Sequence, residues 1–410
     1  MTTTADPTRY SFVPGGTAQP TIIGGSGCLL HTDDGRAILD AAAGAIVGNI
    51  GWGRTEVGAA AGAAMSACGY VIPLWPTPHR LELRDRLVDR WLPDGFTNVF
   101  FTSGGSESTD SAIRLARAYQ VGKGRNDRWK VIGRHPSYHG MTTGTLAVGS
   151  HSSRQAGYEP LLLPFPKVAW DDIDDVVRVF ESEGSAIAGF IAEPITGAAG
   201  ACLTASDEYW QVVTDLCRQH DVLLIADEVM TGYGRTGLNF GHQHFPFQPD
   251  VIVGGKGLGG GYVPLGAVAT TAVVADVLRS SGFMYFTFTG NDGACAAANV
   301  VLDIIEREGL VQRVADVGPV LGDRLRAEFA DHPAVTDVRG RGLFYGIELT
   351  CNRDQVVGAA LQRDMWVYPA GSGPVPNAVM VAPPFVVTLD QIEQIVTTLR
   401  AAIDDVAQTG

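Results

Sequence analysis

The sequence predicts an α/β protein with a mainly parallel sheet covered by helices on both faces, and a smaller α+β domain beside it. Two observations predict this class. The middle of the chain repeats one rhythm, in which a short apolar run ends in glycine or polar residues and an amphipathic stretch follows. The C-terminal part departs from that rhythm. With 410 residues, 45% of them hydrophobic, the chain can bury a large core in more than one domain.

Five apolar runs are the expected strands of the large sheet. They lie in "NVFFTSGG" (98–105), "WKVIGRHPSYHG" (129–140), "AIAGFIAEPITG" (186–197), "DVLLIADEV" (221–229) and "DVIVGGKG" (250–257). Continuous apolar strands are typical of a parallel sheet that is buried on both faces. Ligands of such sheets bind at the carboxyl ends of the strands, so we expect the polar residues that end these runs to converge on one crevice.

The C-terminal part predicts a different local structure. The stretch 335–350, "VTDVRGRGLFYGIELT", has the pattern of two strands joined by a turn, and 388–408 has apolar residues at helical spacing. Thr388 and Gln391 form a capping box at the start of that helix. We expect residues 1–60 and 310–410 to form the small domain together, and 61–309 to form the large one.

Composition restricts the partners and the compartment. A net charge of −14 argues against nucleic acid or an anionic membrane as the main partner. No apolar run is long enough to span a membrane, and the first residues lack the pattern of a secretory signal. The cysteines are scattered without a C-x-x-C pair, which indicates reduced thiols in a cytoplasmic protein. The pair His242 and His244 favours a loop over a metal site, and no metal is expected.

The stretch "TSGGSES" (102–108) is a candidate phosphate site. A strand ends here, two glycines allow close approach of the backbone, and a helix begins at about Ser106. Helix N-termini offer free N–H groups and a positive dipole end to a phosphate. The alternative is an ordinary strand-to-helix turn with a serine cap.

Asp227 and Lys256 are candidate catalytic residues, since each follows an apolar run. A buried carboxylate needs a partner, which a pyridinium N–H, a metal or an arginine such as Arg235 can supply. A desolvated lysine can act as a neutral nucleophile and form a Schiff base, and we expect the surrounding glycines to leave both faces of it open. Residues 255–260 also match the dinucleotide fingerprint G-x-G-x-x-G, with Asp276 at a suitable distance, but no amphipathic helix follows.

A phosphate cradle, a buried aspartate and an accessible lysine are together the three groups that pyridoxal phosphate needs. At this point the chain resembles the class III aminotransferases, which are pyridoxal-phosphate enzymes of fold type I. Motifs in family order carry the resemblance over nearly the whole chain: "NIGWGR", "FFTSGGSES", "SYHG", "IAEPITGAAG", "LLIADEVMTGYGRTG", "DVIVGGKGLGGGYVPLGAV", "FTFTGNDGACAAA", "GRGLFYGIEL" and "APPFVVT".

The resemblance implies a seven-stranded, mainly parallel sheet in the large domain, and a homodimer or a dimer of dimers with a shared active site. It implies that Lys256 is the Schiff-base lysine and that Asp227 is the partner of the pyridine nitrogen. It also implies the other cofactor contacts: Val229 and Tyr138 on the two ring faces, His139 in the same motif as Tyr138, Gly105 and Ser106 at the phosphate, Glu193 near the phenolic edge, and Thr287 from the neighbouring subunit.

The reaction implied is a ping-pong amino transfer in which Lys256 moves the proton between the substrate carbon and the cofactor carbon. The expected donor is a primary amine or a β- or ω-amino acid, hydrophobic or aromatic, and the expected acceptor is a keto acid such as pyruvate. A decarboxylating aminotransferase or an aminomutase would use the same residues. A nicotinamide-dependent dehydrogenase and a non-catalytic binding protein are the readings from other classes.

The chain departs from the family in two places. The phosphate loop reads "SGGS" where an asparagine is usual, and the arginine that many members carry about ten residues before Pro383, as a carboxylate clamp, is absent. Arg339 and Arg341 are candidates for that role only by residue type. The residues expected to line the substrate entrance are Ile46, Trp52, Tyr70 and Trp75.

Overall fold

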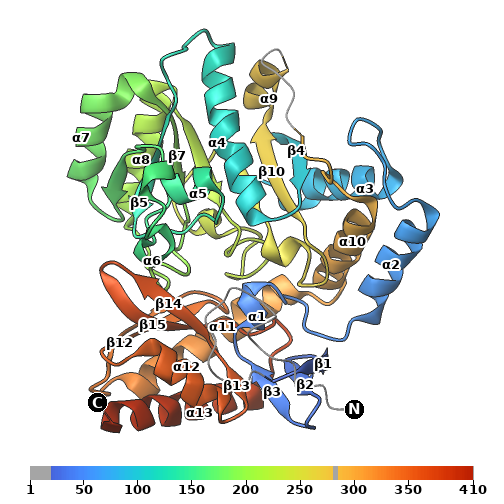
Figure 1. Ribbon diagram of the computed structural model, residues 1–410, viewed down its shortest axis with the longest axis vertical. Helices are drawn as coiled ribbons and strands as arrows, with labels where there is room; N and C mark the ends of the chain where they lie inside the picture. The colour runs from blue at the N-terminus through green and yellow to red at the C-terminus, as the bar shows by residue number, and fades with distance from the viewer. Residues whose placement is uncertain (1–19, 280–284, 410) are drawn as a thin grey trace.

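The computed structural model describes residues 20–279 and 285–409. Figure 1 shows the large sheet and its helices in the upper half of the molecule, and the N- and C-terminal strands together in the lower half. The first 19 residues of the predicted segment 1–60 lie outside the described residues. Within the described residues, no helix combines the length and the apolar content needed to cross a membrane.

The large sheet has seven strands in the order β4-β10-β9-β8-β7-β5-β6. Their bounds are β4 Phe96–Thr102, β10 Gly266–Thr271, β9 Val251–Gly254, β8 Leu223–Asp227, β7 Ile187–Ala192, β5 Lys130–His135 and β6 Lys167–Ala169. Only β10 runs antiparallel to its neighbours, while β9, β8, β7, β5 and β6 pair in parallel. The predicted mainly parallel sheet is therefore confirmed.

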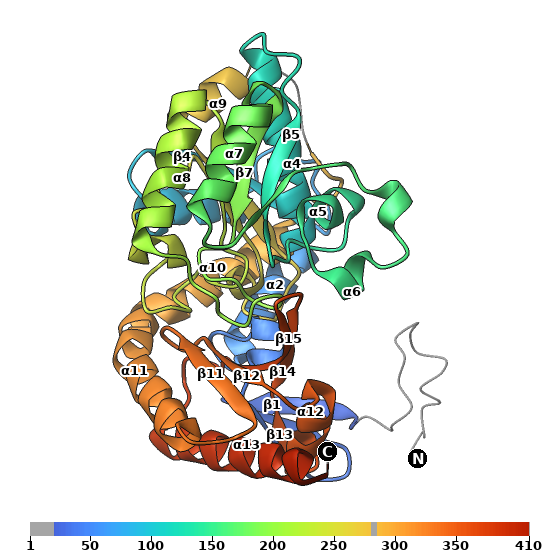
Figure 2. The same ribbon diagram turned by 90° about the vertical axis from the view of Figure 1, so that its left-hand side faces the viewer.

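Helices cover both faces of this sheet, as Figure 2 shows in side view. The helices that contact its strands are α4 Gly105–Gly122, α5 Thr143–Val148, α7 Ile173–Glu183, α8 Asp207–His220 and α9 Ala272–Leu278. Two further helices of this part of the chain are α6 Ser152–Gln155 and α10 Asp292–Arg307. Successive strand residues point to opposite faces. Ile225 of β8 accordingly packs with Leu115 of α4, whereas Leu224 packs in the core that contains Trp210 of α8. Every residue of β8 and β7 is buried, which explains their unbroken apolar sequences.

Two four-stranded sheets form the lower half of the molecule. One consists of β1 Ile22–Ser26, β2 Leu29–Thr32, β3 Ala37–Asp40 and β13 Met365–Trp366, and the other of β11 Val335–Gly340, β12 Tyr345–Leu349, β15 Val375–Val381 and β14 Tyr368–Ser372. The parallel pairing of β3 with β13 joins the N-terminal strands to the C-terminal part of the chain. Their helices are α11 Leu310–Phe329, α12 Arg353–Leu361 and α13 Leu389–Thr409.

Both local predictions for the C-terminal part are confirmed. The stretch 335–350 forms the antiparallel pair β11 and β12. The capping box precedes α13: the backbone N–H of Gln391 donates to Thr388 Oγ1 at 3.1 Å, and the N–H of Thr388 donates to Gln391 Oε1 at 3.0 Å. Three further helices, α1 Ala43–Ile46, α2 Thr55–Ala67 and α3 Pro78–Arg86, follow the N-terminal strands, and α2 and α3 pack against α10.

Candidate active site

A cavity of about 140 Å³ lies at the carboxyl edge of the large sheet. The residues that follow β4, β5, β7, β8 and β9 converge on it, as the strand pattern predicts. Its lining consists of Gly105, Ser106, Tyr138, His139, Gly140, Glu193, Asp227, Val229, Met230 and Lys256.

Lys256 follows β9 in a short 3-10 turn and has a left-handed backbone with φ of 39°. Its side chain is partly accessible within the cavity, while protein surrounds its amine. Burial lowers the pKa of the Lys256 amine, although the carboxylates of Asp227 and Glu193 act in the opposite direction. A lysine in this setting is more readily available as a neutral amine than a lysine in water.

The glycines around Lys256 do not leave open space, so that part of the prediction is wrong. A Cβ on Gly254 would lie 2.2 Å from Tyr233 Oη, and a Cβ on Gly257 would lie 2.3 Å from Asn49 Nδ2. A Cβ on Gly255 would lie 3.2 Å from the Cα of Gly105. These glycines allow neighbouring segments to pack closely around the lysine turn. The short turn also fails to begin the long helix that the dinucleotide fingerprint requires.

Asp227, the last residue of β8, is held in place by two donors. Its Oδ2 lies 2.7 Å from Nδ1 of His139, and its Oδ1 accepts the N–H of Val229 at 3.1 Å. The alternative of an ion pair with Arg235 is wrong, because the buried guanidinium of Arg235 donates to two backbone carbonyls and to Asn49 Oδ1. Asp227 thus presents a fixed carboxylate to the cavity.

The start of α4 forms the end of the cavity where we predicted a phosphate site. The N-cap residue is Gly104, and no side chain of the described residues caps the helix, so the alternative of a serine cap is wrong. The hydroxyl of Ser106 accepts the N–H of Met141 at 3.2 Å. Gly105 and Ser106 both face the cavity and leave N–H groups of the first turn available to an anion.

Glu193 joins two walls of the cavity. Its carboxylate accepts the N–H of Tyr138 at 3.0 Å and the N–H of Gly197 at 2.7 Å. Burial raises the pKa of Glu193, and the negative charge of Asp227 adds to this effect. The cavity therefore holds two carboxyl groups, and their proximity and burial disfavour two negative charges at once.

The residues predicted at the substrate entrance do not line this cavity as the described residues form it. The indole N–H of Trp52 donates to Asp40 Oδ2 at 2.9 Å, and Ile46 is buried in a cluster that also contains Met230. Tyr70 and Trp75 are exposed. Thr287 is exposed too and lies outside the cavity of its own chain.

Sequence reasoning missed two features of the site. Met230 lines the cavity and packs closely against Gly197, since a Cβ on Gly197 would lie 2.3 Å from Met230 Sδ. The contact between His139 and Asp227 was not foreseen either. The available signal was that Asp227 ends one strand and that His139 lies shortly after another strand of the same parallel sheet, which places both at the same edge.

Neither candidate for the missing carboxylate clamp reaches the cavity in the described part of the chain. Arg339 donates to the carboxylates of Asp337 and Glu348 and to the carbonyls of Gly200 and Ala201. Arg341 lies beside His244, with 3.5 Å between Nη1 and Nδ1.

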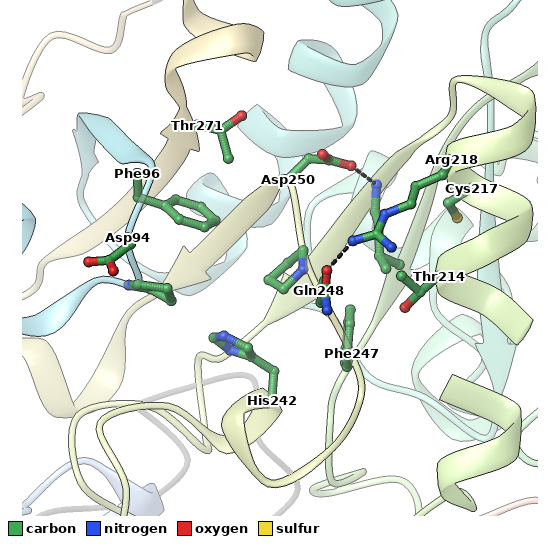
Figure 3. Close-up of a pocket in the computed structure, with 13 residues that line it drawn as sticks. Asp94, Phe96, Thr214, Cys217, Arg218, His242, Phe247, Gln248, Asp250 and Thr271 are labelled. Carbon is green, nitrogen blue, oxygen red and sulfur yellow. Dashed lines mark hydrogen bonds between the residues drawn. The ribbon is translucent and has the colours of Figure 1, made fainter. Parts of the chain in front are cut away.

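A second cavity of about 350 Å³ lies at the opposite edge of the large sheet, where β8 and β9 begin (Figure 3). Asp250 accepts the N–H of Leu224 at 2.9 Å there, and Arg218 donates to Gln248. His242, which also lines this cavity, contacts Glu228 at 2.7 Å through Nδ1. No lysine is among the residues lining it in the described chain, so it lacks the groups that the sequence singles out.

Comparisons with known proteins agree with this geometry. A family model described as aminotransferase class III matches residues 17–403. The acetylornithine aminotransferase of Aquifex aeolicus is 34% identical over 92% of this chain and 95% of its own length. The putrescine–pyruvate aminotransferase of Pseudomonas aeruginosa is 32% identical over 93% and 91%. The structure of the omega transaminase from Pseudomonas jessenii in complex with PMP superposes with a TM-score of 0.89, at 28% identity over 97% of each chain.

Proposed function

The chain belongs to the class III aminotransferases, which use pyridoxal phosphate, and from this premise we propose that it moves an amino group from a primary amine or a β- or ω-amino acid to pyruvate. The reaction class and the cofactor follow from the family. The fold agrees, since structures of transaminases match the chain over nearly its whole length. The nicotinamide-dependent and non-catalytic readings no longer stand. Donor, acceptor and the role of each site residue are our proposals.

The cavity fits pyridoxal phosphate on the evidence of its own residues. The uncapped start of α4, at Gly105 and Ser106, suits the phosphate. Asp227, already fixed by His139, suits a protonated ring nitrogen. Lys256 lies in the same cavity with a lowered pKa. The presence of these three groups in one enclosed space is the observation that carries the proposal.

The chemistry that pyridoxal phosphate supplies when bound is electron withdrawal from the carbon that bears the amino group. Lys256 would accept the proton released from the substrate carbon and then donate it to the cofactor carbon. To accept the proton, its amine must be neutral. Asp227 would keep the ring nitrogen protonated, and Val229 and Tyr138 would hold the ring between them. Glu193 would fix the backbone of Tyr138 through its hydrogen bond.

Two observations support the proposed substrates. Tyr138, Val229 and Met230 give the cavity wall an apolar part, which favours a hydrophobic or aromatic donor. Pyruvate is proposed as the acceptor because one relative is named a putrescine–pyruvate aminotransferase.

We propose a homodimer, or a dimer of dimers, in which Thr287 completes the phosphate site of the partner copy. The rings of Tyr70 and Phe288 lie 5.9 Å apart between centroids, and with Leu74 and Trp75 we treat them as one exposed apolar cluster next to Thr287. Leu74, Trp75 and Phe288 are 62%, 68% and 58% exposed. Arg80 ties the two segments of this cluster together, since its guanidinium donates to the carbonyls of Trp75 and Gly290. Exposed aromatic surface of this kind is typical of an interface.

The proposal is tested by the visible absorption of the purified protein loaded with pyridoxal phosphate. We expect particular amines, added without a keto acid, to bleach the visible band of the bound cofactor, and pyruvate to restore it. K256A should lack both responses and lose about 10²- to 10⁴-fold or more in turnover. K123A is the matched control, because Lys123 pairs with Asp221 outside the cavity.

Product analysis separates the remaining alternatives. With pyruvate as the acceptor, we expect one alanine to form for each amine consumed. Release of carbon dioxide would indicate a decarboxylating aminotransferase, and isomerisation without any keto acid would indicate an aminomutase. A protein that takes up the cofactor but shows no amine-dependent bleaching would contradict the proposal.

A further inference from the structure

Arg154 is an exposed arginine on the short helix α6. Within residues 20–279 and 285–409, no carboxylate forms an ion pair with it and no acceptor takes a hydrogen bond from its guanidinium. Other arginines around the site are engaged: Arg134 donates to the carbonyls of Trp170 and Glu193, and Arg353 donates to the carbonyls of Ala370 and Gly371. Arg154 is thus a cation beside the site with its donors still available.

The position of α6 links this cation to the cavity. His151, which precedes α6, packs edge-on against the ring of Tyr138 with 6.0 Å between ring centroids, and Tyr138 lines the cavity. The N–H of Arg154 donates to the carbonyl of His151 at 2.9 Å. Arg154 is therefore one helical turn from a residue that touches the cavity wall.

The helix α6 also forms hydrogen bonds with the sheet that contains β14. Ser152 contacts Ser372 Oγ at the end of β14 through its N–H at 3.1 Å and its hydroxyl at 3.2 Å. Figure 1 shows α6 directly above β14 and β15. The segment that contains β14 carries no arginine between Tyr368 and Val381. The arginine that reaches β14, Arg353, donates to its carbonyls, so Arg154 adds a cation whose donors remain available.

Electrostatics agree with this placement. Burial raises the pKa of Tyr138, and the positive charge of Arg154 offsets part of that rise. Burial lowers the pKa of His151 to about 4, and Arg154 adds to that shift. The charge of Arg154 therefore acts on both rings that separate it from the cavity.

A keto acid needs a cation at some distance from the deep end of the cavity. Asp227 is committed to the ring nitrogen and Glu193 is a carboxyl group, so neither can bind a carboxylate, and Lys256 is required for proton transfer. The carboxylate must then point toward the mouth. A guanidinium is well suited to it, because it can form two parallel charge-assisted hydrogen bonds.

We propose that Arg154 binds the carboxylate of the keto acid acceptor at the mouth of the cavity. This inference rests on the proposed function and adds the residue that selects carboxylate-bearing acceptors. It also predicts that aldehydes, which lack the carboxylate, gain nothing from Arg154.

The test separates the two half-reactions. The protein loaded with pyridoxal phosphate is first converted by an amine without a carboxylate, and the visible band is then restored by pyruvate or by propanal in a stopped-flow experiment. R154Q, R154K and R114Q are compared with the unsubstituted protein. Arg114 is the matched control, since it is an exposed arginine on α4 that does not line the active-site cavity.

We expect R154Q to raise the apparent dissociation constant of pyruvate by roughly 10- to 100-fold, as loss of a charge-assisted hydrogen-bonded pair predicts. The constant for propanal should change by less than about twofold, and R154K should retain part of the affinity for pyruvate. Calorimetry with propionate, which has the carboxylate but no keto group, should show the same weakening without any reaction.

Two outcomes would overturn the proposal while leaving the aminotransferase assignment intact. In one, R154Q and R114Q have the same constant for pyruvate. In the other, R154Q weakens pyruvate and propanal equally, which would indicate a distorted site. A failure of the first half-reaction in the unsubstituted protein would instead overturn the proposed function, and the role of Arg154 with it.

Discussion

Lys256 combines a left-handed backbone with a desolvated amine, and both are unfavourable for a lysine. A φ of 39° costs roughly 1–3 kcal/mol in a residue other than glycine. The surrounding structure maintains it, because Gly254, Gly255 and Gly257 allow Tyr233, α4 and Asn49 to pack tightly around the turn. This packing thus holds the lysine turn with its side chain in the cavity.

Asp227 illustrates how a neighbouring side chain prepares a residue for its role. His139 Nδ1 lies 2.7 Å from its carboxylate, while Nε2 of the same ring is buried without a hydrogen-bond partner among the described residues. One ring nitrogen is therefore committed to Asp227. We expect His139 to act as a positioning residue that keeps the carboxylate aimed into the cavity.

His244 gives a prediction for the pH dependence of stability. Burial, with the nearby charge of Arg341, lowers its pKa from 6.5 to about 4. The unfolded chain therefore binds the proton of His244 more tightly than the folded chain does. The contribution of His244 to the free energy of unfolding is fully present above about pH 6.5 and is lost as the pH drops from 6.5 towards 4. H244Q should remove about 1–2 kcal/mol of the difference between pH 7 and pH 4.5, after allowance for the partial exposure of the ring.

Urea unfolding of both proteins at the two pH values measures this effect. The double difference cancels any loss of packing that is common to both conditions. An equal drop in the free energy of unfolding for both proteins would show that His244 does not carry the dependence.

At the scale of elements, the site depends on how closely α4 approaches the segment that follows β8. A Cβ on Gly105 would lie 2.8 Å from Val229 Cγ1, so only glycine permits this approach. The same residue begins the helix whose N–H groups face the cavity. Close packing against Val229 and anion binding at the helix start thus both require glycine at position 105.

G105A tests this requirement. We expect it to raise the dissociation constant of pyridoxal phosphate by about 10-fold or more, because Val229 or the start of α4 must shift. G104A is the neighbouring control, since a Cβ there meets nothing within 4 Å. Fluorescence titration of the apoprotein with the cofactor measures both. Equal affinity in the two variants would contradict the packing argument.

At the scale of the whole molecule, segments far apart in sequence depend on one another. The strands β1 to β3 complete a sheet with β13, and α2 packs against α10. Apolar surface stays exposed in this arrangement at the cluster of Tyr70, Leu74, Trp75 and Phe288. We expect a second copy of the chain to cover it.

L74E should weaken the proposed dimer by at least about 10- to 100-fold, because a charge would be buried in an apolar interface. L389E is the matched control: Leu389 is 59% exposed, close to the 62% of Leu74, and lies at the start of α13. Sedimentation equilibrium measures both variants. A monomeric unsubstituted protein, or equal behaviour of L74E and L389E, would contradict the proposed interface.

The sequence by itself determined the elements and the edge on which the site lies. Apolar runs that end in Asp227, Glu193 and Lys256 are local signals, and parallel strands must bring their carboxyl ends together. The hairpin at 335–350 and the capping box at Thr388 are local too, so they were predictable.

Only the tertiary structure decided which residues meet across elements. The contact of His139 with Asp227, the engagement of Arg235 elsewhere and the proximity of α6 to β14 depend on packing between segments that are 80 or more residues apart, on which local patterns carry no information. The function of the glycines was misjudged for the same reason: whether a missing Cβ leaves space or permits contact depends on its neighbours.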